Sequence, residues 1–161
     1  MHCNGNGYKL EKEHKKLVTD NRKARHNYHI ETKYEAGMVL LGTEVKALRM
    51  GRAHLKDAYA KIKDGEVYLH QMHIGPYPFA YYGNHEPLRP RKLLLHKYEI
   101  KRLFGKVNEK GYSLVPLNVY FVNGKAKVTI ALARGKRLHD KREAIKRRDE
   151  KRELERTKKE Y

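Results

Sequence analysis

The last 22 residues, 140–161, limit most strongly what this chain can fold into. Charged side chains fill seventeen of these positions, ten with Lys or Arg and seven with Asp or Glu. So few apolar side chains remain that the segment cannot build a core. It is therefore either a solvated appendage or an arm that becomes ordered against a highly charged partner.

The position of this segment divides the chain into three parts. Residues 21–133 are long enough for one domain, which would bury roughly two thirds of its unfolded surface. We expect a charged tail at 134–161 and a disordered extension at 1–20. The extension has no apolar stretch typical of a secretory signal, and Cys3 has no second cysteine with which to form a disulfide. A cytoplasmic protein fits best.

The net charge of +18 favours a polyanionic partner, and nucleic acid is the first candidate. A membrane is not expected as a partner, because no apolar run approaches the roughly 20 residues that span a bilayer. The charged tail also lacks the bulky apolar face of an interfacial helix.

Alternating apolar and polar residues predict mainly β structure in the domain. The segments 26–33, 38–48, 57–63 and 66–72 are interpreted as strands, and Asp64-Gly65 is a strong hairpin signal. Strands at 112–122 and 125–133 surround a second such turn, Asn123-Gly124, which requires positive φ at both residues. Together these segments predict a small closed, OB-fold-like barrel.

One helix is predicted between the strands. Leu93, Ile100, Leu103, Phe104 and Val107 recur at helical spacing, and Gly105 is placed to end the helix in a left-handed conformation.

Several basic side chains are candidates for contact with RNA phosphates. Those directly before the predicted strand at 26–33 are long donors that are either simply solvated or bind phosphate, and we favour the second reading. The side chains directly before that strand are Arg22, Lys23, Arg25 and His26.

Two further cations, Lys46 and Arg49, are expected to be exposed where Val45 and Leu48 face the core.

Acidic residues on such a basic surface have two interpretations. A carboxylate either pairs with a neighbouring Arg, or accepts hydrogen bonds from base amino groups. Further along the chain, Arg91 and Lys92 are expected to be exposed beside three leucines at 93–95. These leucines cannot all face one core, so at least one is a candidate to pack on an RNA sugar or base.

Tyr77, Phe79 and Tyr81 alternate and would share one face of an extended segment. We expect this face to fill the barrel interior, with stacking on unpaired bases as the alternative.

No set of residues in the sequence is typical of a catalytic site or a metal site. His70 and His73 form the only tight histidine pair, and a zinc site needs three or four converging ligands. Nucleotide-binding loops, nucleophile elbows and paired catalytic carboxylates are not found. We therefore expect neither catalytic residues nor a cofactor. An RNA-cleaving or RNA-modifying enzyme that uses His and Glu ranks far behind an RNA-binding protein.

Seven blocks in the chain resemble those of a known family, in its order and spacing. They are Asn21-Arg-Lys-Ala-Arg-His26, Tyr34-Glu-Ala-Gly37, Gly42-Thr-Glu-Val-Lys-Ala-Leu-Arg49, Asp64-Gly-Glu66, Arg91-Lys-Leu-Leu-Leu-His96, Gly105-Lys-Val-Asn-Glu-Lys-Gly-Tyr112 and Ala133-Arg-Gly-Lys-Arg-Leu-His-Asp-Lys-Arg142. The resemblance is to SmpB, the bacterial SsrA-binding proteins. Ala47 stands where that family often has Ser, and residues 1–20 have no counterpart with a known role.

The resemblance implies an OB-fold barrel that binds the tRNA-like domain of transfer-messenger RNA (tmRNA) and brings it to stalled ribosomes for trans-translation. It also implies small-subunit ribosomal RNA as a partner, and elongation factor Tu through aminoacylated tmRNA. In the family the Asn, the carboxylate and an exposed Leu of these blocks support the grip on tmRNA. They fall here on Asn21, Glu35 and Leu94. A general RNA-binding or ribosome-assembly protein is the alternative, opposed only by the ordered motifs.

The same resemblance implies that the tail occupies the downstream mRNA channel and senses that it is empty. Helical there, residues 140–161 would reach about 30 Å. Alone the tail is expected to be disordered, because pairs such as Glu143 with Arg147 each contribute only about 0.2–0.5 kcal/mol. The implied decoding-site and channel residues are Lys136, Arg137, His139, Asp140, Lys141, Arg142, Lys146 and Arg147.

Overall fold

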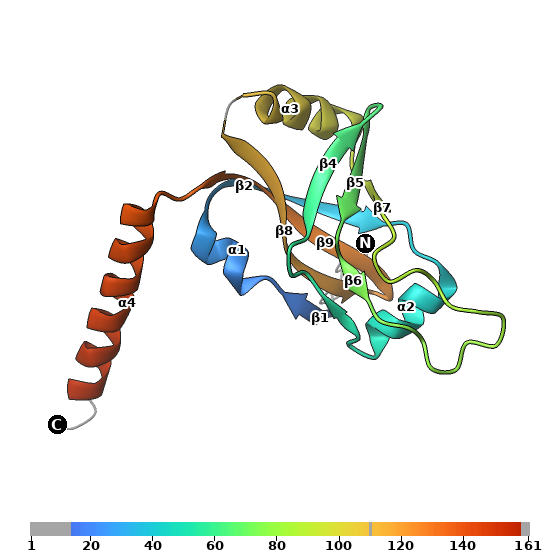
Figure 1. Cartoon of the computed structure of the whole chain (residues 1–161), viewed down its shortest axis with the longest axis horizontal. Coiled ribbons are helices and arrows are strands. Elements are labelled where there is room, and N and C mark those ends of the chain that lie inside the picture. Colours follow the sequence, from blue (N-terminus) through green and yellow to red (C-terminus); the bar gives the residue numbers. More distant parts are fainter. Residues whose placement is uncertain (1–13, 110, 159–161) are drawn as a thin grey trace, which may run out of the picture.

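The computed structural model describes residues 14–109 and 111–158, and Figure 1 shows their arrangement. Strands predominate. The described elements are, in chain order, β1 Lys15–Asp20, α1 Arg22–Asn27, β2 Tyr28–Met38, α2 Gly42–Arg49, β3 Ala53–His54, β4 Tyr59–Lys63, β5 Glu66–His70, β6 His73–Ile74, β7 Arg91–Leu94, α3 Lys97–Val107, β8 Tyr112–Val122, β9 Lys125–Gly135 and α4 Leu138–Thr157.

The main sheet closes on itself. Its strands follow the order β1-β8-β4-β5-β7-β2-β9, and β9 also pairs with β8, so the strands from β8 to β9 form a ring. Every pairing in it is antiparallel. β1 lies outside the ring and pairs only with β8, while β3 and β6 form a separate two-stranded sheet. The prediction of a mainly β, closed barrel is confirmed; the OB-fold name stays a prediction.

Two apolar clusters stabilise this arrangement. The larger one fills the barrel, where alternate residues of β9 such as Val128, Ile130 and Leu132 point inward. The smaller one lies outside it, where Ala24 of α1 packs on β8 and β9 residues including Leu117. β8 and β9 are therefore apolar on both faces, as a strand covered on both sides should be.

Both predicted hairpin turns are confirmed. Asp64 and Gly65 have φ of 52° and 73°, and Asn123 and Gly124 have φ of 49° and 77°. Positive φ at both turn residues matches the right-handed twist of the strands on either side.

The predicted strand at 38–48 is wrong, because the strand ends at Met38 and α2 follows. Glu44, Ala47 and Leu48 are its buried residues. These buried residues are three positions and then one position apart, which places them on one face of a helix. The alternation of apolar and polar residues in the same segment suggested a strand instead. The predicted strand at 26–33 also begins too early, because residues 22–27 form α1 and β2 starts at Tyr28.

The predicted helix is present but shifted. Leu93 lies in β7, and α3 begins at Lys97. Gly105 does not end the helix, which continues to Val107 with Asn108 as its C-cap. Val107 packs against the main core, and this contact holds the last turn beyond the glycine.

Two further expectations are corrected. Residues 15–20, placed in a disordered extension, form β1; residues 1–13 lie outside the described residues. The aromatic residues at 77–82 do not fill the barrel, because Phe79, Tyr81 and Tyr82 are 75%, 90% and 97% exposed. They belong to the long loop between β6 and β7.

Candidate nucleic-acid interface

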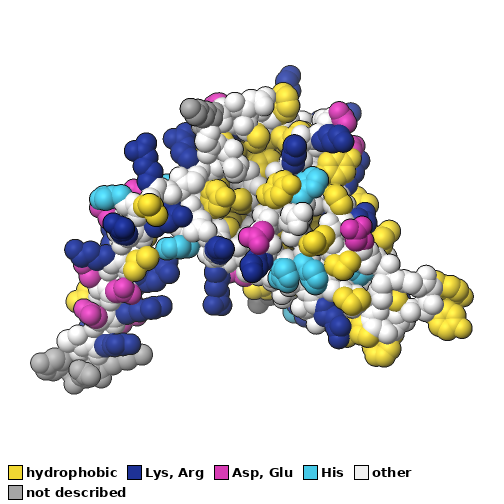
Figure 2. Space-filling view, viewed as in Figure 1, with side chains coloured by type: hydrophobic (Ala, Val, Ile, Leu, Met, Phe, Trp, Pro, Cys, Tyr) yellow, Lys and Arg dark blue, Asp and Glu magenta, His cyan; other side chains and the backbone are white. Residues whose placement is uncertain are grey.

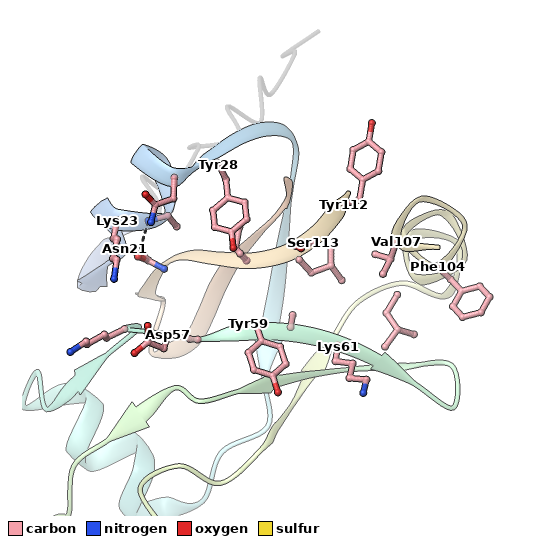
Figure 3. A pocket seen from close by; sticks show the side chains of 18 of the residues that line it. Asn21, Lys23, Tyr28, Asp57, Tyr59, Lys61, Phe104, Val107, Tyr112 and Ser113 are labelled. Atoms are coloured by element: carbon pink, nitrogen blue, oxygen red, sulfur yellow. Dashed lines mark hydrogen bonds between the residues drawn. The ribbon is translucent and has the colours of Figure 1, made fainter. Parts of the chain in front are cut away.

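A groove lies where two strands of the barrel separate. β4 and β8 pair only at Ala60 and Leu114, which leaves space between the rest of the two strands. α1 and α3 border this space, and its volume is about 770 Å³. We call it the α1 groove (Figure 3). Its polar and aromatic lining residues include Asn21, Lys23, Tyr28, Lys56, Asp57, Tyr59, Lys61 and Tyr112.

Asn21 sets the position of α1 at this groove. Its side-chain oxygen accepts a hydrogen bond from the Ala24 N–H at 3.1 Å and so caps the helix. Its side-chain amide donates to the Pro116 carbonyl at 3.0 Å, and its backbone N–H donates to Leu117 at 2.7 Å. The residue therefore fastens α1 to β8.

The cations predicted near residue 21 are presented on α1. Arg22 and Lys23 are exposed, and Lys23 lines the α1 groove. Arg25 is exposed but pairs with Asp20 at 3.0 Å. His26 is half-buried, and its Nδ1 has no hydrogen-bond partner among the described residues. Arg22 and Lys23 are thus the members best placed to reach a phosphate.

A second groove brings together two residues 59 positions apart. Glu35 of β2 and Leu94 of β7 both line a depression of about 850 Å³, which we call the Glu35 groove. β2 and β7 pair antiparallel with Gly37 opposite Leu94. A Cβ at Gly37 would lie 3.4 Å from the Leu94 Cβ, in ordinary van der Waals contact, so the two residues are direct neighbours across the strands.

Two neighbouring side chains contact the Glu35 carboxylate at this groove. The Tyr120 hydroxyl donates a hydrogen bond to Glu35, and the Lys127 ammonium lies 3.7 Å from its other carboxylate oxygen. The Glu35 side chain is 46% exposed and Leu94 is 54% exposed. A carboxylate beside an exposed leucine can accept a hydrogen bond from the amino group of a base while the leucine packs on the flat face of a base or on a sugar.

Lys127 was missed by the sequence reasoning. It is one of many lysines on alternating strands, and only the register of β9 against β2 brings it to Glu35. A pattern of period two fixes which face a residue occupies but not its neighbour across the sheet.

The other predicted cations are dispersed. Lys46 and Arg49 are exposed on α2, as predicted, over the rings of Tyr77 at 5.3 Å and Phe121 at 6.0 Å. Lys92 is partly exposed and lies 2.5 Å from Glu66.

The predicted exposure of Arg91 is wrong, because its side chain is completely buried. Arg91 donates from Nε to Glu44 at 2.9 Å and from its terminal nitrogens to the carbonyls of Met72 and Pro87. Arg89 also donates to Glu44, at 2.7 Å. A charge this deep requires such partners, and Arg91 therefore joins the loop, α2 and β7 rather than touching a ligand.

The charged tail leaves the barrel as α4 (Figure 1). None of its described residues is buried, and Figure 2 shows Lys, Arg, Asp and Glu side chains along its length. The Lys136 N–H donates to the Asn27 carbonyl at 2.8 Å, and Asp140 lies 3.5 Å from His29. The structure holds this segment as a helix; its expected disorder in isolation stays a prediction about an equilibrium.

The six other predicted tail residues lie at the start or in the first half of α4. His139 is exposed and lies 3.7 Å from Glu143. Arg137 is the N-cap, and its backbone N–H donates to Asp140. Lys141 is half-buried, whereas the remaining predicted cations are exposed: Arg142, Lys146 and Arg147.

The part of the chain that the structure describes holds neither a metal-binding cluster nor a membrane-spanning helix. Within 14–109 and 111–158, no three His, Cys, Asp or Glu side chains converge as a metal site, and His73 stacks instead on His54 at 4.6 Å. No helix in that part of the chain has the length and apolar character needed to cross a membrane.

The fold and site define a small basic β-barrel with two open grooves and a projecting charged helix. The SmpB protein family model matches residues 18–160, which cover the barrel, both grooves and the described length of α4. The chain belongs to the SmpB family.

Relatives with known names agree with this assignment. The SsrA-binding protein of Geobacter metallireducens is 59% identical over 139 residues, which are 86% of this chain and 91% of that protein. The SsrA-binding protein of Moorella thermoacetica is 61% identical over 142 residues, covering 88% and 92%. A solved structure described as "tmRNA-SmpB: a journey to the center of the bacterial ribosome" matches with a TM-score of 0.63 and 52% identity, covering 78% and 92%.

Proposed function

We propose that this chain binds the tRNA-like domain of tmRNA and delivers it to stalled ribosomes for trans-translation. The observation that carries the proposal is the family match, which spans the grooves and α4 in one alignment. Its relatives are named SsrA-binding proteins, and the solved neighbour concerns tmRNA, SmpB and the bacterial ribosome.

The two grooves would hold the RNA in different ways. Around the α1 groove, exposed cations such as Arg22 and Lys23 bind phosphates, and tyrosines such as Tyr59 offer faces for bases. In the Glu35 groove the carboxylate and Leu94 supply contacts that phosphate binding cannot. Arg91 is not part of this proposed interface. The remaining proposed contacts are Arg25, His26, Lys46, Arg49 and Lys92, with Asn21 positioning α1.

We assign α4 and the residues before it to the ribosome. The 20 residues of α4 correspond to about 30 Å of helix, long enough to line a channel. Its eight cations are offset by six acidic residues within 138–157, so it suits an RNA-walled channel better than tight non-specific binding. Helix formation there would report that the channel contains no message.

The remaining parts of the proposal concern setting and chemistry. The protein would act in the cytoplasm as an RNA-binding protein and not as an enzyme, and elongation factor Tu would meet it through aminoacylated tmRNA.

Binding across a salt series tests the proposal. Affinity for a tmRNA tRNA-like domain is measured beside an ordinary tRNA of similar length, because phosphate contacts weaken steeply with salt while base and shape contacts persist. We expect the tmRNA domain to be preferred at near-physiological salt. Equal affinities that fall together would instead indicate a general RNA-binding or ribosome-assembly protein.

A second experiment tests the tail separately. A chain stopped after Leu138 should bind the tRNA-like domain as the full chain does but fail to support tagging on stalled ribosomes. If tagging survives the truncation, the role proposed for α4 is wrong.

A further inference from the structure

An aromatic loop projects from the barrel at the end away from α4. Residues 75–90 join β6 to β7, and Figure 1 shows them extending beyond α2. Figure 2 shows hydrophobic side chains gathered on the protruding end. Phe79, Tyr81 and Tyr82 are each at least 75% exposed, which is unusual for three large aromatic side chains in four residues. Neither groove includes any of them.

The loop is held in one shape by its own polar groups. The Asn84 side chain accepts from the Tyr77 N–H at 2.8 Å and donates to the Tyr77 carbonyl at 3.1 Å. These two hydrogen bonds connect the two sides of the loop. Next to it, the buried His85 ring lies 2.9 Å from the Thr43 hydroxyl and 3.0 Å from the Ile74 carbonyl. These hydrogen bonds hold the base of the loop in place. Binding a ligand therefore costs less conformational entropy than it would if the loop had to become ordered first.

The rings themselves stay separate rather than forming a packed cluster. Tyr77 and Phe79 meet edge to face with centroids 5.7 Å apart, and Tyr81 and Tyr82 do so at 5.0 Å. In edge-to-face pairs at least one ring face stays open. Nearly full exposure of Tyr81 and Tyr82 means that their faces are available to a planar partner.

Charge distinguishes among the possible partners of the loop. Residues 76–84 contain no ionisable group except tyrosine. The exposed Glu86 follows them in the loop, and two cations lie at its base. The Lys46 ammonium lies 5.3 Å from the Tyr77 ring, and the Arg52 carbonyl accepts from the Gly75 N–H at 2.7 Å, which places that arginine at the loop base. Aromatic faces above a cationic base are the pattern that binds single-stranded nucleic acid, through stacking and phosphate contacts together. A second copy of this chain is disfavoured by its net charge of +18.

We propose that the loop at 75–90 is a separate binding site for the unpaired bases of single-stranded RNA. Phe79, Tyr81 and Tyr82 stack on successive bases, and Lys46 lies near the phosphates between them. The site goes beyond the function proposed above, because its three stacking residues belong neither to the grooves nor to α4 and it shares only Lys46 with the contacts proposed for tmRNA. Since every base has a flat face, the site prefers unpaired over paired RNA and has little preference for sequence.

The test compares two triple variants of the full chain. One replaces Phe79, Tyr81 and Tyr82 with Ser, and the other replaces them with Leu, which keeps the apolar surface but removes the flat rings. Tyr98→Ser is the control, because Tyr98 is 63% exposed on α3, outside the loop. Affinity is measured for an unpaired 12-nucleotide oligoadenylate and for a duplex RNA of equal length, at moderate and at high salt.

We expect both triple variants to bind oligoadenylate at least about tenfold more weakly, because each removes all three rings on which bases would stack. Duplex binding should change little, and Tyr98→Ser should resemble the parent. Unchanged oligoadenylate binding in the Ser variant overturns the proposal. Full oligoadenylate binding by the Leu variant also overturns it, because the apolar surface and not the flat rings would then account for the binding. Neither result alters the preference for the tRNA-like domain, so the two proposals fail separately.

Discussion

At the scale of single residues, Glu44 has the most demanding surroundings for a charge. Its side chain has no exposed surface and accepts hydrogen bonds from Arg89, Arg91 and the Leu41 N–H. Burial raises the pKa of Glu44, but the hydrogen bonds from Arg89 and Leu41 and the charge of Arg91 together outweigh it, so the pKa lies below its ordinary value. The carboxylate is thus held ionised and joins α2 to the loop and β7.

Glu44→Gln should destabilise the protein by about 3–5 kcal/mol, because Arg91 is left buried without a counter-charge. Urea unfolding measures this change. Glu66→Gln is the control: Glu66 also pairs with a cation, Lys92, but both side chains are about 40% exposed, so a much smaller change is expected. Equal losses in the two variants would contradict a structural role for the buried pair.

The pH dependence of stability follows from the same residue. Because the pKa of folded Glu44 is lowered, its contribution is present above the unfolded value near 4.5 and is lost as pH falls through the lower folded value. The free energy of unfolding should therefore decline below about pH 4.5. Glu44→Gln should flatten this decline; an unchanged slope would assign it to other carboxylates.

Glu35→Arg should weaken binding to the tRNA-like domain although it adds positive charge. The guanidinium would face Lys127 and replace the carboxylate that accepts from the Tyr120 hydroxyl at the Glu35 groove. Glu31→Arg, an exposed position on the same strand, is the charge-matched control and should bind as well as the parent or better. If Glu35→Arg strengthens binding in a titration, bulk electrostatics dominate the interface.

At the scale of elements, two glycines have opposite roles. Gly105 lies inside α3, where an added Cβ meets no atom within 4 Å. Gly124 is in the β8–β9 turn with φ of +77°, which an L side chain rarely adopts. Gly105→Ala should therefore raise the free energy of unfolding by about 0.5–1 kcal/mol, and Gly124→Ala should lower it by about 1 kcal/mol or more. Thermal and urea unfolding check both signs; destabilisation by Gly105→Ala would mean that the helix does end there.

The helix of the tail can be tested without changing its charge. Ala144→Pro interrupts the interior of α4, at a cost of about 3 kcal/mol to the helix. Leu138→Pro is the matched control, because the first helical position tolerates proline and the preceding Arg137 is already extended, with ψ of 157°. We expect tagging to fail with Ala144→Pro and to persist with Leu138→Pro, while both bind the tRNA-like domain normally. If both variants support tagging, the charges of the tail and not its helix are required.

At the scale of the whole molecule, β1 is the one strand of the main sheet outside its closed ring. It covers residues 118–122 of β8. A chain beginning at Asn21 should still unfold cooperatively, since the ring of β8, β4, β5, β7, β2 and β9 is complete without it. Its urea midpoint should be lower because the uncovered edge of β8 loses those backbone hydrogen bonds. Failure of this chain to fold would make β1 part of the barrel's core.

The three proposed RNA-binding features lie on different parts of the molecule. α4 and the aromatic loop project at opposite ends, with the barrel between them (Figure 1). Such a layout lets one small protein touch separate RNA segments at once, and binding at several points raises the overall affinity without a larger interface.

The sequence by itself determined the features that depend on local chemistry. Charge density set the tail apart, Asp64-Gly65 and Asn123-Gly124 predicted their turns, and seven ordered blocks indicated the family. Glu35 and Leu94 were named through that resemblance, and not from their spacing.

Only the tertiary structure decided which residues meet. The pairing of β2 with β7 and β9 brings Leu94 and Lys127 to Glu35, and α2 packing withdraws Arg91 into the interior. The exposure of the aromatic loop had no local signal either, because alternation shows only that side chains share a face. Whether that face meets a core or solvent depends on what the rest of the chain packs against it, which the long-range contacts of the barrel decide.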